Sequence, residues 1–269
     1  MKLTLVQLDQ TLGDVEGNLD RAEARIREAA AAGADLVALP ELFSVGYFAF
    51  ESYAREAEGL EGPTLARLSD LAAELEVGLL AGSVVEDLSA SAAAGVDVPE
   101  PDGLANTSVF FDRQGVRRGV YRKHHLFGYQ SAETQLLTAG ESLATVDFEG
   151  FSVGMTTCYD LRFPELYRDL AEAGATLVLV PSAWPYPRVE HWTTLPKARA
   201  IENLVYVATV NGAAEFDDAT LLGRSTVYDP WGTPLASAGD EPTLVTTEVG
   251  PERVEAVREE FPAWADRRR

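Results

Sequence analysis

Short apolar runs and longer stretches of helical composition alternate along this chain of 269 residues. The short runs, rich in β-branched residues, predict strands, and the longer stretches predict helices. The expected strands lie at 3–8, 35–39, 77–82, 107–111, 116–121, 151–157, 176–180, 205–210, 223–228 and 243–249. The expected helices lie at 18–32, 63–76 and 192–203, and one more begins at 163–165. Strands that alternate with helices in this way predict an α/β fold.

Glycine and proline mark the ends of these elements. Gly33 is placed to cap the helix that precedes it, Pro63 falls in the first turn of the next, and Pro40 stops the strand at 35–39. The chain divides into two β-rich halves with helices in both. This pattern predicts a four-layer αββα sandwich, in which two mixed sheets pack face to face and the helices lie outside.

The length suits one large α/β domain or two small ones, and we expect a single domain over residues 1–269. Residues 86–103 are rich in Ala, Ser, Pro and Asp. We interpret them as a surface insertion rather than a linker, because a strand resumes directly after them. A C-terminal tail is expected from about residue 251.

Acidic residues dominate the charge. The 43 Asp and Glu outnumber the 22 Lys and Arg, for a net charge of −21. This charge argues against nucleic acid as a partner, because phosphates would be repelled. No apolar run approaches the roughly 20 residues that span a bilayer, and Asp9 follows too early for a signal peptide. We therefore expect a cytoplasmic protein with no membrane partner.

The acids are spread over the chain, and only three lysines are present: Lys2, Lys123 and Lys197. This composition is typical of proteins from salt-accumulating microbes, so we predict a halophilic protein. Unscreened repulsion at low ionic strength should destabilise the fold. The melting temperature should therefore be higher in molar potassium chloride than in dilute buffer. Equal melting temperatures in both would contradict the prediction.

Cys158 is the single cysteine, which excludes an internal disulfide and a cysteine-rich zinc site. It follows the strand at 151–157 and precedes the helix start marked by Pro164 and Glu165. The partial positive charge of a helix N-terminus favours the thiolate and is expected to lower the pKa of the cysteine. By residue type alone, the alternative is a small buried apolar side chain.

Two more reactive side chains follow strands. Glu41 comes after the strand at 35–39, and Lys123 comes after the strand at 116–121. Ligand chemistry in α/β sheets gathers beyond the carboxyl ends of strands. Singly, Glu41 could be a solvated acid and Lys123 part of a basic surface patch. Together with Cys158 they predict one site.

Five motifs carry a family resemblance. They are LPEL at 39–42, KHHLF at 123–127, CYDLRFPE at 158–165, HW at 191–192 with ARAIEN at 198–203, and DPWG at 229–232. With these motifs, the chain resembles the nitrilase superfamily of carbon–nitrogen hydrolases over nearly its whole length. The resemblance implies an αββα sandwich that forms a homodimer or a higher homo-oligomer, with Glu41, Lys123 and Cys158 as a catalytic triad. The second glutamate of the family matches Glu133, with Glu141 as the alternative.

These residue types fit the hydrolysis of an amide by water. The resemblance implies that Cys158 attacks the carbonyl carbon and that Glu41 moves its proton. Lys123 and the backbone N–H of Tyr159 would hold the oxyanion, while Glu133 orients Lys123 or the substrate nitrogen. No cofactor and no metal are expected. Adjacent histidines such as those at 124 and 125 point apart, and no third ligand has suitable spacing.

The residues around the cysteine favour one branch. Nitrilases usually have Cys-Trp-Glu at the nucleophile, whereas Tyr159 and Asp160 follow Cys158 here, which favours amide substrates. The resemblance is closest to the omega-amidases, which deaminate dicarboxylic monoamides such as 2-oxoglutaramate. The alternatives are an N-carbamoyl amino acid hydrolase, another aliphatic amidase, or a non-catalytic interaction protein.

A substrate with a distal carboxylate needs a positive group in this acidic protein. Arg162 or Arg188 could supply it, although Arg162 could instead form a salt bridge with Glu165. Trp184 follows a strand and is expected either to line the pocket or to pack in the core. His191 is expected to be a packing or capping residue.

Overall fold

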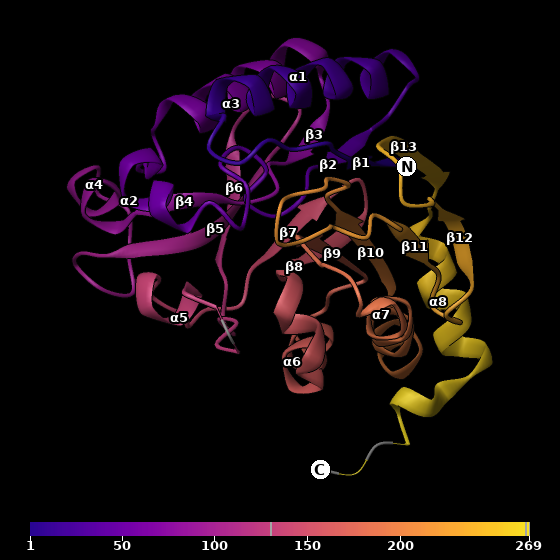
Figure 1. Cartoon of the computed structure of the whole chain (residues 1–269). Coiled ribbons are helices and arrows are strands. Elements are labelled where there is room, and N and C mark those ends of the chain that lie inside the picture. Colours follow the sequence, from indigo (N-terminus) through magenta and orange to yellow (C-terminus); the bar gives the residue numbers. More distant parts are fainter. Residues whose placement is uncertain (130, 267, 269) are drawn as a thin grey trace.

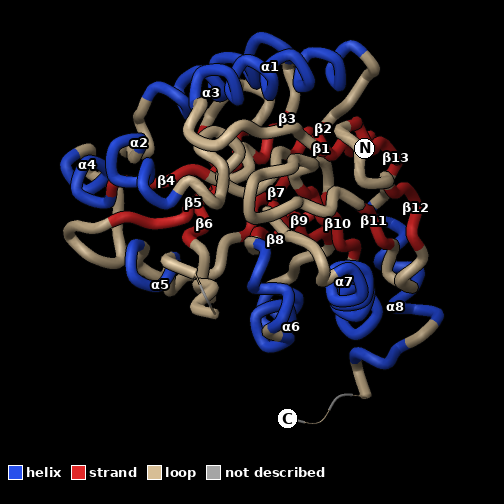
Figure 2. Tube along the Cα trace, viewed as in Figure 1, coloured by secondary structure: helices blue, strands red, loops and turns tan. Residues whose placement is uncertain are grey.

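The computed structural model describes residues 1–129, 131–266 and 268. Its strands form two mixed sheets that pack face to face, with helices on both outer sides (Figure 1). Figure 2 shows the strands in the middle of the molecule and the long helices above and below them. The predicted four-layer αββα sandwich is confirmed.

The first sheet has the order β13-β1-β2-β3-β5-β4, and β6 also pairs with β5. Its strands are β1 (Lys2–Gln7), β2 (Leu36–Ala38), β3 (Gly78–Leu80), β4 (Val84–Asp87), β5 (Leu104–Phe111), β6 (Arg117–Arg122) and β13 (Thr243–Glu248). β2 and β3 are parallel, and β5 is antiparallel to both β3 and β6. Therefore β6 runs in the same direction as β2, and both end toward the same edge.

The second sheet has the order β12-β11-β10-β9-β8-β7. Its strands are β7 (Thr145–Phe148), β8 (Phe151–Met155), β9 (Leu177–Ser182), β10 (Tyr206–Asn211), β11 (Thr226–Tyr228) and β12 (Pro234–Ser237). The three central strands β8, β9 and β10 are parallel. The carboxyl ends of β8 and β9 therefore lie at one edge of this sheet.

Helices cover the outer faces. In Figure 1, α1 (Val15–Ala31) and α3 (Pro63–Leu75) lie over the first sheet, and α6 (Pro164–Glu172) and α7 (Val189–Asn203) lie under the second. The shorter helices are α2 (Tyr53–Glu56), α4 (Leu88–Ala93) and α5 (Glu133–Leu136). Within the described ranges, no helix is long and apolar enough to cross a membrane.

The core has one layer between the sheets and one under each helical layer. In β1, Leu3 and Leu5 pack with Met155 and Leu177 of the second sheet, whereas Val6 joins the cluster beneath α1 and α3. This alternation follows from the two-residue repeat of a strand. Central strands that contact a core layer on each side therefore carry apolar residues on both faces.

Several elements differ from the sequence prediction. α1 begins at Val15 rather than at residue 18, because the side chain of Asp14 accepts a hydrogen bond from the backbone of Gly17 and caps the helix. β7 and β12 were not predicted. Both lie at the edges of the second sheet, where only one face needs apolar residues and the apolar signal is weak.

The expected surface insertion at 86–103 and the expected C-terminal tail both contain regular secondary structure. Within 86–103, the first two residues belong to β4, and α4 follows directly. Glu86 in that strand is fully buried and forms an ion pair with Arg122. Beyond residue 250, the chain forms α8 (Pro251–Glu260).

Candidate active site

Three predicted residues converge from strand ends of both sheets. Glu41 lies just beyond β2 and Lys123 just beyond β6, on the same edge of the first sheet. Cys158 follows β8 of the second sheet. Glu133, the first residue of α5, completes the group. The four side chains are at least nine-tenths buried, so they form one enclosed site.

Lys123 lies between two carboxylates. Its Nζ donates to Glu41 Oε1 at 2.8 Å and to Glu133 Oε1 at 2.7 Å. Burial opposes the charge on Lys123, but the two carboxylates outweigh it and raise the pKa of this lysine well above its usual value. The ammonium therefore stays charged, since such geometry compensates the cost of removing it from water.

Glu41 connects the lysine to the cysteine. Its Oε2 accepts a hydrogen bond from Ala183 N at 2.9 Å, and its carboxylate lies close enough to the thiol of Cys158 for the two groups to affect each other's pKa. Burial raises the pKa of Glu41, although Lys123 partly offsets this effect. Burial and the nearby carboxylate also raise the pKa of Cys158.

The expectation that a helix N-terminus lowers the pKa of the cysteine is therefore wrong. Cys158 starts a 3₁₀ helix of only five residues, so the helix is too short to outweigh burial and the negative charge of Glu41. At neutral pH the sulfur carries a proton. A nucleophilic thiolate at this position consequently requires a base, and Glu41 is in contact with it.

The turn that holds Cys158 has a strained backbone and is stabilised by hydrogen bonds from Arg199. Cys158 has a φ of +48°, a left-handed conformation that only a well-defined surrounding structure maintains in a residue other than glycine. The guanidinium of Arg199 on α7 donates to Leu161 O from Nε and from a terminal nitrogen, at 3.0 and 2.8 Å. α6 begins directly afterwards at Pro164, as predicted.

Asp160 ties this turn to the segment that carries Lys123. Its carboxylate accepts from Thr157 N at 2.9 Å, from Tyr121 Oη at 2.6 Å and from His125 N at 3.0 Å, and it lies 2.8 Å from His125 Nδ1. Tyr121 and His125 lie two residues before and after the lysine. The hydrogen bonds therefore fix the distance between the lysine segment and the turn with the cysteine.

Sequence reasoning missed two residues of the site. Asn106, in the interior of β5, donates from Nδ2 to Glu41 Oε1 at 2.8 Å. Tyr47 donates from its hydroxyl to Glu133 Oε2 at 3.0 Å, and its ring centroid lies 5.5 Å from Lys123 Nζ. The one signal for Asn106 is that asparagine is uncommon inside a buried strand. Tyr47 lies in an aromatic loop whose shape the sequence does not define.

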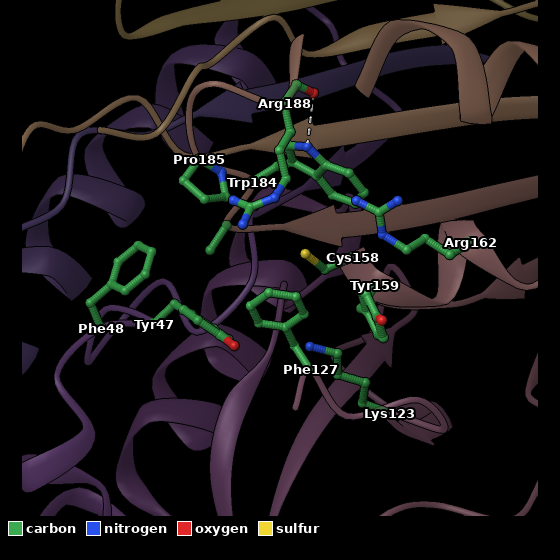
Figure 3. Close-up of a pocket in the computed structure, with 11 residues that line it drawn as sticks. Tyr47, Phe48, Lys123, Phe127, Cys158, Tyr159, Arg162, Trp184, Pro185 and Arg188 are labelled. Carbon is green, nitrogen blue, oxygen red and sulfur yellow. Dashed lines mark hydrogen bonds between the residues drawn. The ribbon is translucent and has the colours of Figure 1, made fainter. Parts of the chain in front are cut away.

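A cavity of about 400 Å³, part of it open to solvent, leads to the cysteine. Figure 3 shows the sulfur of Cys158 among aromatic side chains from several loops. The lining residues are Tyr47, Phe48, Lys123, Phe127, Cys158, Tyr159, Arg162, Ala183, Trp184, Pro185 and Arg188. The three predicted substrate-binding residues, Tyr159, Arg162 and Trp184, all contribute to this wall.

Both candidate arginines line the cavity (Figure 3). The guanidinium of Arg162 lies 5.1 Å from the ring of Trp184, and one of its nitrogens is 3.1 Å from His191 Nδ1. The guanidinium of Arg188 lies 5.7 Å from the ring of Phe127. Among the side chains that the structure describes, neither arginine forms an ion pair with a carboxylate. Arg162 is thus not held by Glu165, and both arginines remain available to an anion.

Trp184 meets both expectations. It lines the cavity, and its ring also packs 5.5 Å from Trp192 in the core beneath the second sheet. Its backbone N–H donates to Asn211 Oδ1 at 2.7 Å. Trp184 therefore forms a rigid side of the cavity.

Comparisons with known proteins agree with this arrangement. The family model described as carbon-nitrogen hydrolase matches residues 2–259. The chain is 36% identical to a 2-oxoglutaramate amidase of Paenarthrobacter nicotinovorans, over 87% of this chain and 79% of that protein. It is 34% identical to the omega-amidase NIT2 of Homo sapiens, over 99% and 95%.

A solved structure extends the similarity to three dimensions. A CN-hydrolase superfamily protein from Xanthomonas campestris, with an arsenic adduct in its active site, superimposes with a TM-score of 0.87. It is 32% identical, and the match covers all of this chain and 97% of that one.

Proposed function

This chain belongs to the carbon–nitrogen hydrolase family, and from that premise we propose that it is an omega-amidase. It would release ammonia from the terminal amide of a small dicarboxylic monoamide such as 2-oxoglutaramate. One observation carries the proposal. A thiol beside a buried carboxylate opens into a cavity lined by two arginines, and neither arginine has a carboxylate partner within the part of the chain that the structure describes. In a chain of net charge −21, such arginines favour an anionic substrate.

The proposed reaction has two halves. Glu41 takes the proton of Cys158 as the sulfur attacks the amide carbon, and Lys123 with the N–H of Tyr159 stabilises the oxyanion. Glu41 then gives the proton to the nitrogen, and the carbon–nitrogen bond breaks. Ammonia departs, and the acyl group remains bound to Cys158 as a thioester. Water attacks the thioester after giving a proton to Glu41, and the proton returns to the sulfur as the acid leaves. No cofactor enters this sequence.

Glu133 has a different role in this proposal. Its Oε1 accepts from Lys123, and its Oε2 accepts from Tyr47 Oη at 3.0 Å and from Phe127 N at 2.7 Å. Both oxygens of Glu133 are thus engaged by donors other than the thiol. We therefore assign it to the orientation of Lys123 rather than to proton transfer.

Ammonia release from a substrate panel at high salt tests the proposed function. The panel contains 2-oxoglutaramate, succinamate, glutamine, a simple nitrile and an N-carbamoyl amino acid, with the Cys158→Ala variant as the blank. Fast release from the first two substrates alone supports an omega-amidase. Release from the carbamoyl compound alone would support an N-carbamoyl hydrolase, and silence across the panel would favour a non-catalytic protein or an untested amide.

The arginines provide a specific prediction. The guanidinium of Arg188 has no polar partner among the described residues, whereas that of Arg162 contacts His191. We expect Arg188→Gln to raise the KM for succinamate by about 10- to 100-fold, the range for a lost hydrogen bond to a charged group. The KM for butyramide, which has no carboxylate, should stay within about twofold. An equal rise for both substrates would contradict this role.

The family resemblance also implies a homodimer, which we propose for this chain. Light scattering coupled to size-exclusion chromatography tests it. A mass of one chain, 29.1 kDa, at micromolar concentration would contradict the dimer.

A further inference from the structure

Asn106 shares its hydrogen-bond acceptors with Lys123. Its Nδ2 lies 2.8 Å from Glu41 Oε1 and 3.5 Å from Glu133 Oε1. These are the two oxygens that Lys123 Nζ contacts. Asn106 is fully buried in β5, so no water competes for these contacts. Two donors, the charged one just beyond β6 and the neutral one within β5, thus hold the same carboxylate pair.

The chemistry of the neighbours fixes the orientation of this amide. With the amide rotated by half a turn, the carboxamide oxygen of Asn106 would face both carboxylates, and three acceptors would meet without a proton. In the orientation that avoids this repulsion, Oδ1 of Asn106 is buried without a partner among the described residues. An unpaired buried acceptor is costly and rare, so the interactions of Nδ2 must compensate for it.

The charge of the cluster explains why a neutral donor is useful. Among the described residues, the ionisable groups that act on Glu41 are Lys123, Glu133 and Cys158. Tyr47 contacts Glu133 on its other oxygen, Oε2. Two carboxylates and one ammonium leave one uncompensated negative charge in a buried site. A second cation would neutralise this charge and weaken the base. An amide stabilises the carboxylate and leaves its charge in place.

We propose that Asn106 is a positioning residue that holds Glu41 by Oε1, fixes the orientation of its carboxylate beside the thiol of Cys158 and stabilises the carboxylate form of Glu41. This inference rests on the proposed function, because it assigns Glu41 as the base. It concerns a residue that touches no reacting atom of the substrate.

The pH dependence of two reactions tests the inference. Loss of the donor in Asn106→Ala destabilises the anion, so Glu41 should bind its proton more tightly. The acid limb of kcat/KM for succinamate should therefore move to higher pH by about one unit, the scale of one lost hydrogen bond to a charged group. The rate of alkylation of Cys158 by iodoacetamide should show the same shift. Since Cys158 is the single cysteine, this second readout needs no substrate and has no background.

Two further variants separate the donor from the space it fills. Asn106→Asp keeps the volume, removes the donor and adds an acid, so its acid limb should also move upward. Asn203, which is equally buried and bonds to the backbone at the end of α7, provides the control. Asn203→Ala should lower the melting temperature without moving either limb.

The outcomes are distinct. An upward shift in either folded variant of Asn106 supports the inference, and a limb that coincides with that of the wild type overturns it. The acid limb of the pH profile for Cys158 alkylation tests the role of Asn106 even if the wild type hydrolyses no amide on the panel. In that case the proposed function fails, and the role of Asn106 is judged by the thiol alone.

Discussion

Replacing Lys123 by methionine is expected to lower kcat by about 10²- to 10³-fold and to destabilise the fold. The proposed reaction makes Lys123 an oxyanion donor, and removal of such a donor typically costs about 10²- to 10³-fold. The substitution also leaves Glu41 and Glu133 buried without their shared cation. Loss of one partner of a buried ion pair costs about 3–5 kcal/mol. Turnover and thermal melts measure the two effects.

The loss of stability should depend on pH in a defined direction. Burial already raises the pKa of Glu41, and loss of the lysine charge would raise it further. A folded-state pKa above the unfolded value favours the folded protein at low pH and disfavours it as pH rises. The melting temperature of the Lys123→Met variant should therefore fall further below that of the wild type at pH 8 than at pH 5.

Lys197→Met is the matched control for this prediction. Lys197 is exposed on α7, so the substitution removes the same charge from the surface. It should change neither kcat nor the melting temperature by a measurable amount. A Lys123→Met variant as active and as stable as this control would contradict the assigned role of Lys123.

Glu41→Gln is expected to lower kcat by about 10³-fold with little change in KM. General acid–base catalysis contributes about 10²- to 10⁴-fold, and glutamine keeps the size of the side chain without its basicity. Alkylation also requires removal of the thiol proton, so the thiol of Cys158 should react more slowly with iodoacetamide at pH 7 when the proposed base is absent. Steady-state kinetics and timed alkylation check both results.

Glu86→Gln provides the comparison for Glu41. Glu86 is also fully buried in the first sheet, but it pairs with Arg122 and Thr107 rather than with the cysteine. Its substitution should reduce stability and leave alkylation unchanged. If Glu41→Gln kept more than about a tenth of the wild-type kcat, a base other than Glu41 would be required.

Much of the site could be predicted because it follows strand ends. Glu41, Lys123 and Cys158 each come just after a predicted strand, and ligand chemistry in α/β folds gathers beyond the carboxyl ends of strands. The fold was predictable for the same reason, since buried strands are strongly apolar. The edge strands β7 and β12 were not predicted, because the exposed face of an edge strand carries polar residues and weakens the apolar pattern.

The rest depends on contacts between distant segments. Asn106 lies 65 residues from Glu41 in sequence, and Tyr47 lies 86 residues from Glu133. No local pattern encodes such pairs, because the packing of β5 and of the aromatic loop decides which side chains meet. The pKa of Cys158 could not be predicted for a similar reason, since it depends on burial and on Glu41 rather than on the short helix that follows.

The division of the site between two sheets has a consequence for biosynthesis. Glu41 and Lys123 belong to the part of the chain that leaves the ribosome first, whereas Cys158 follows a strand of the later sheet. The sulfur meets its base only when the two halves have docked, and until then its reactivity is that of an ordinary thiol. Under the proposed mechanism, assembly of the sandwich is therefore the step that joins the nucleophile to its base, and a nascent or partly opened chain has no hydrolytic site.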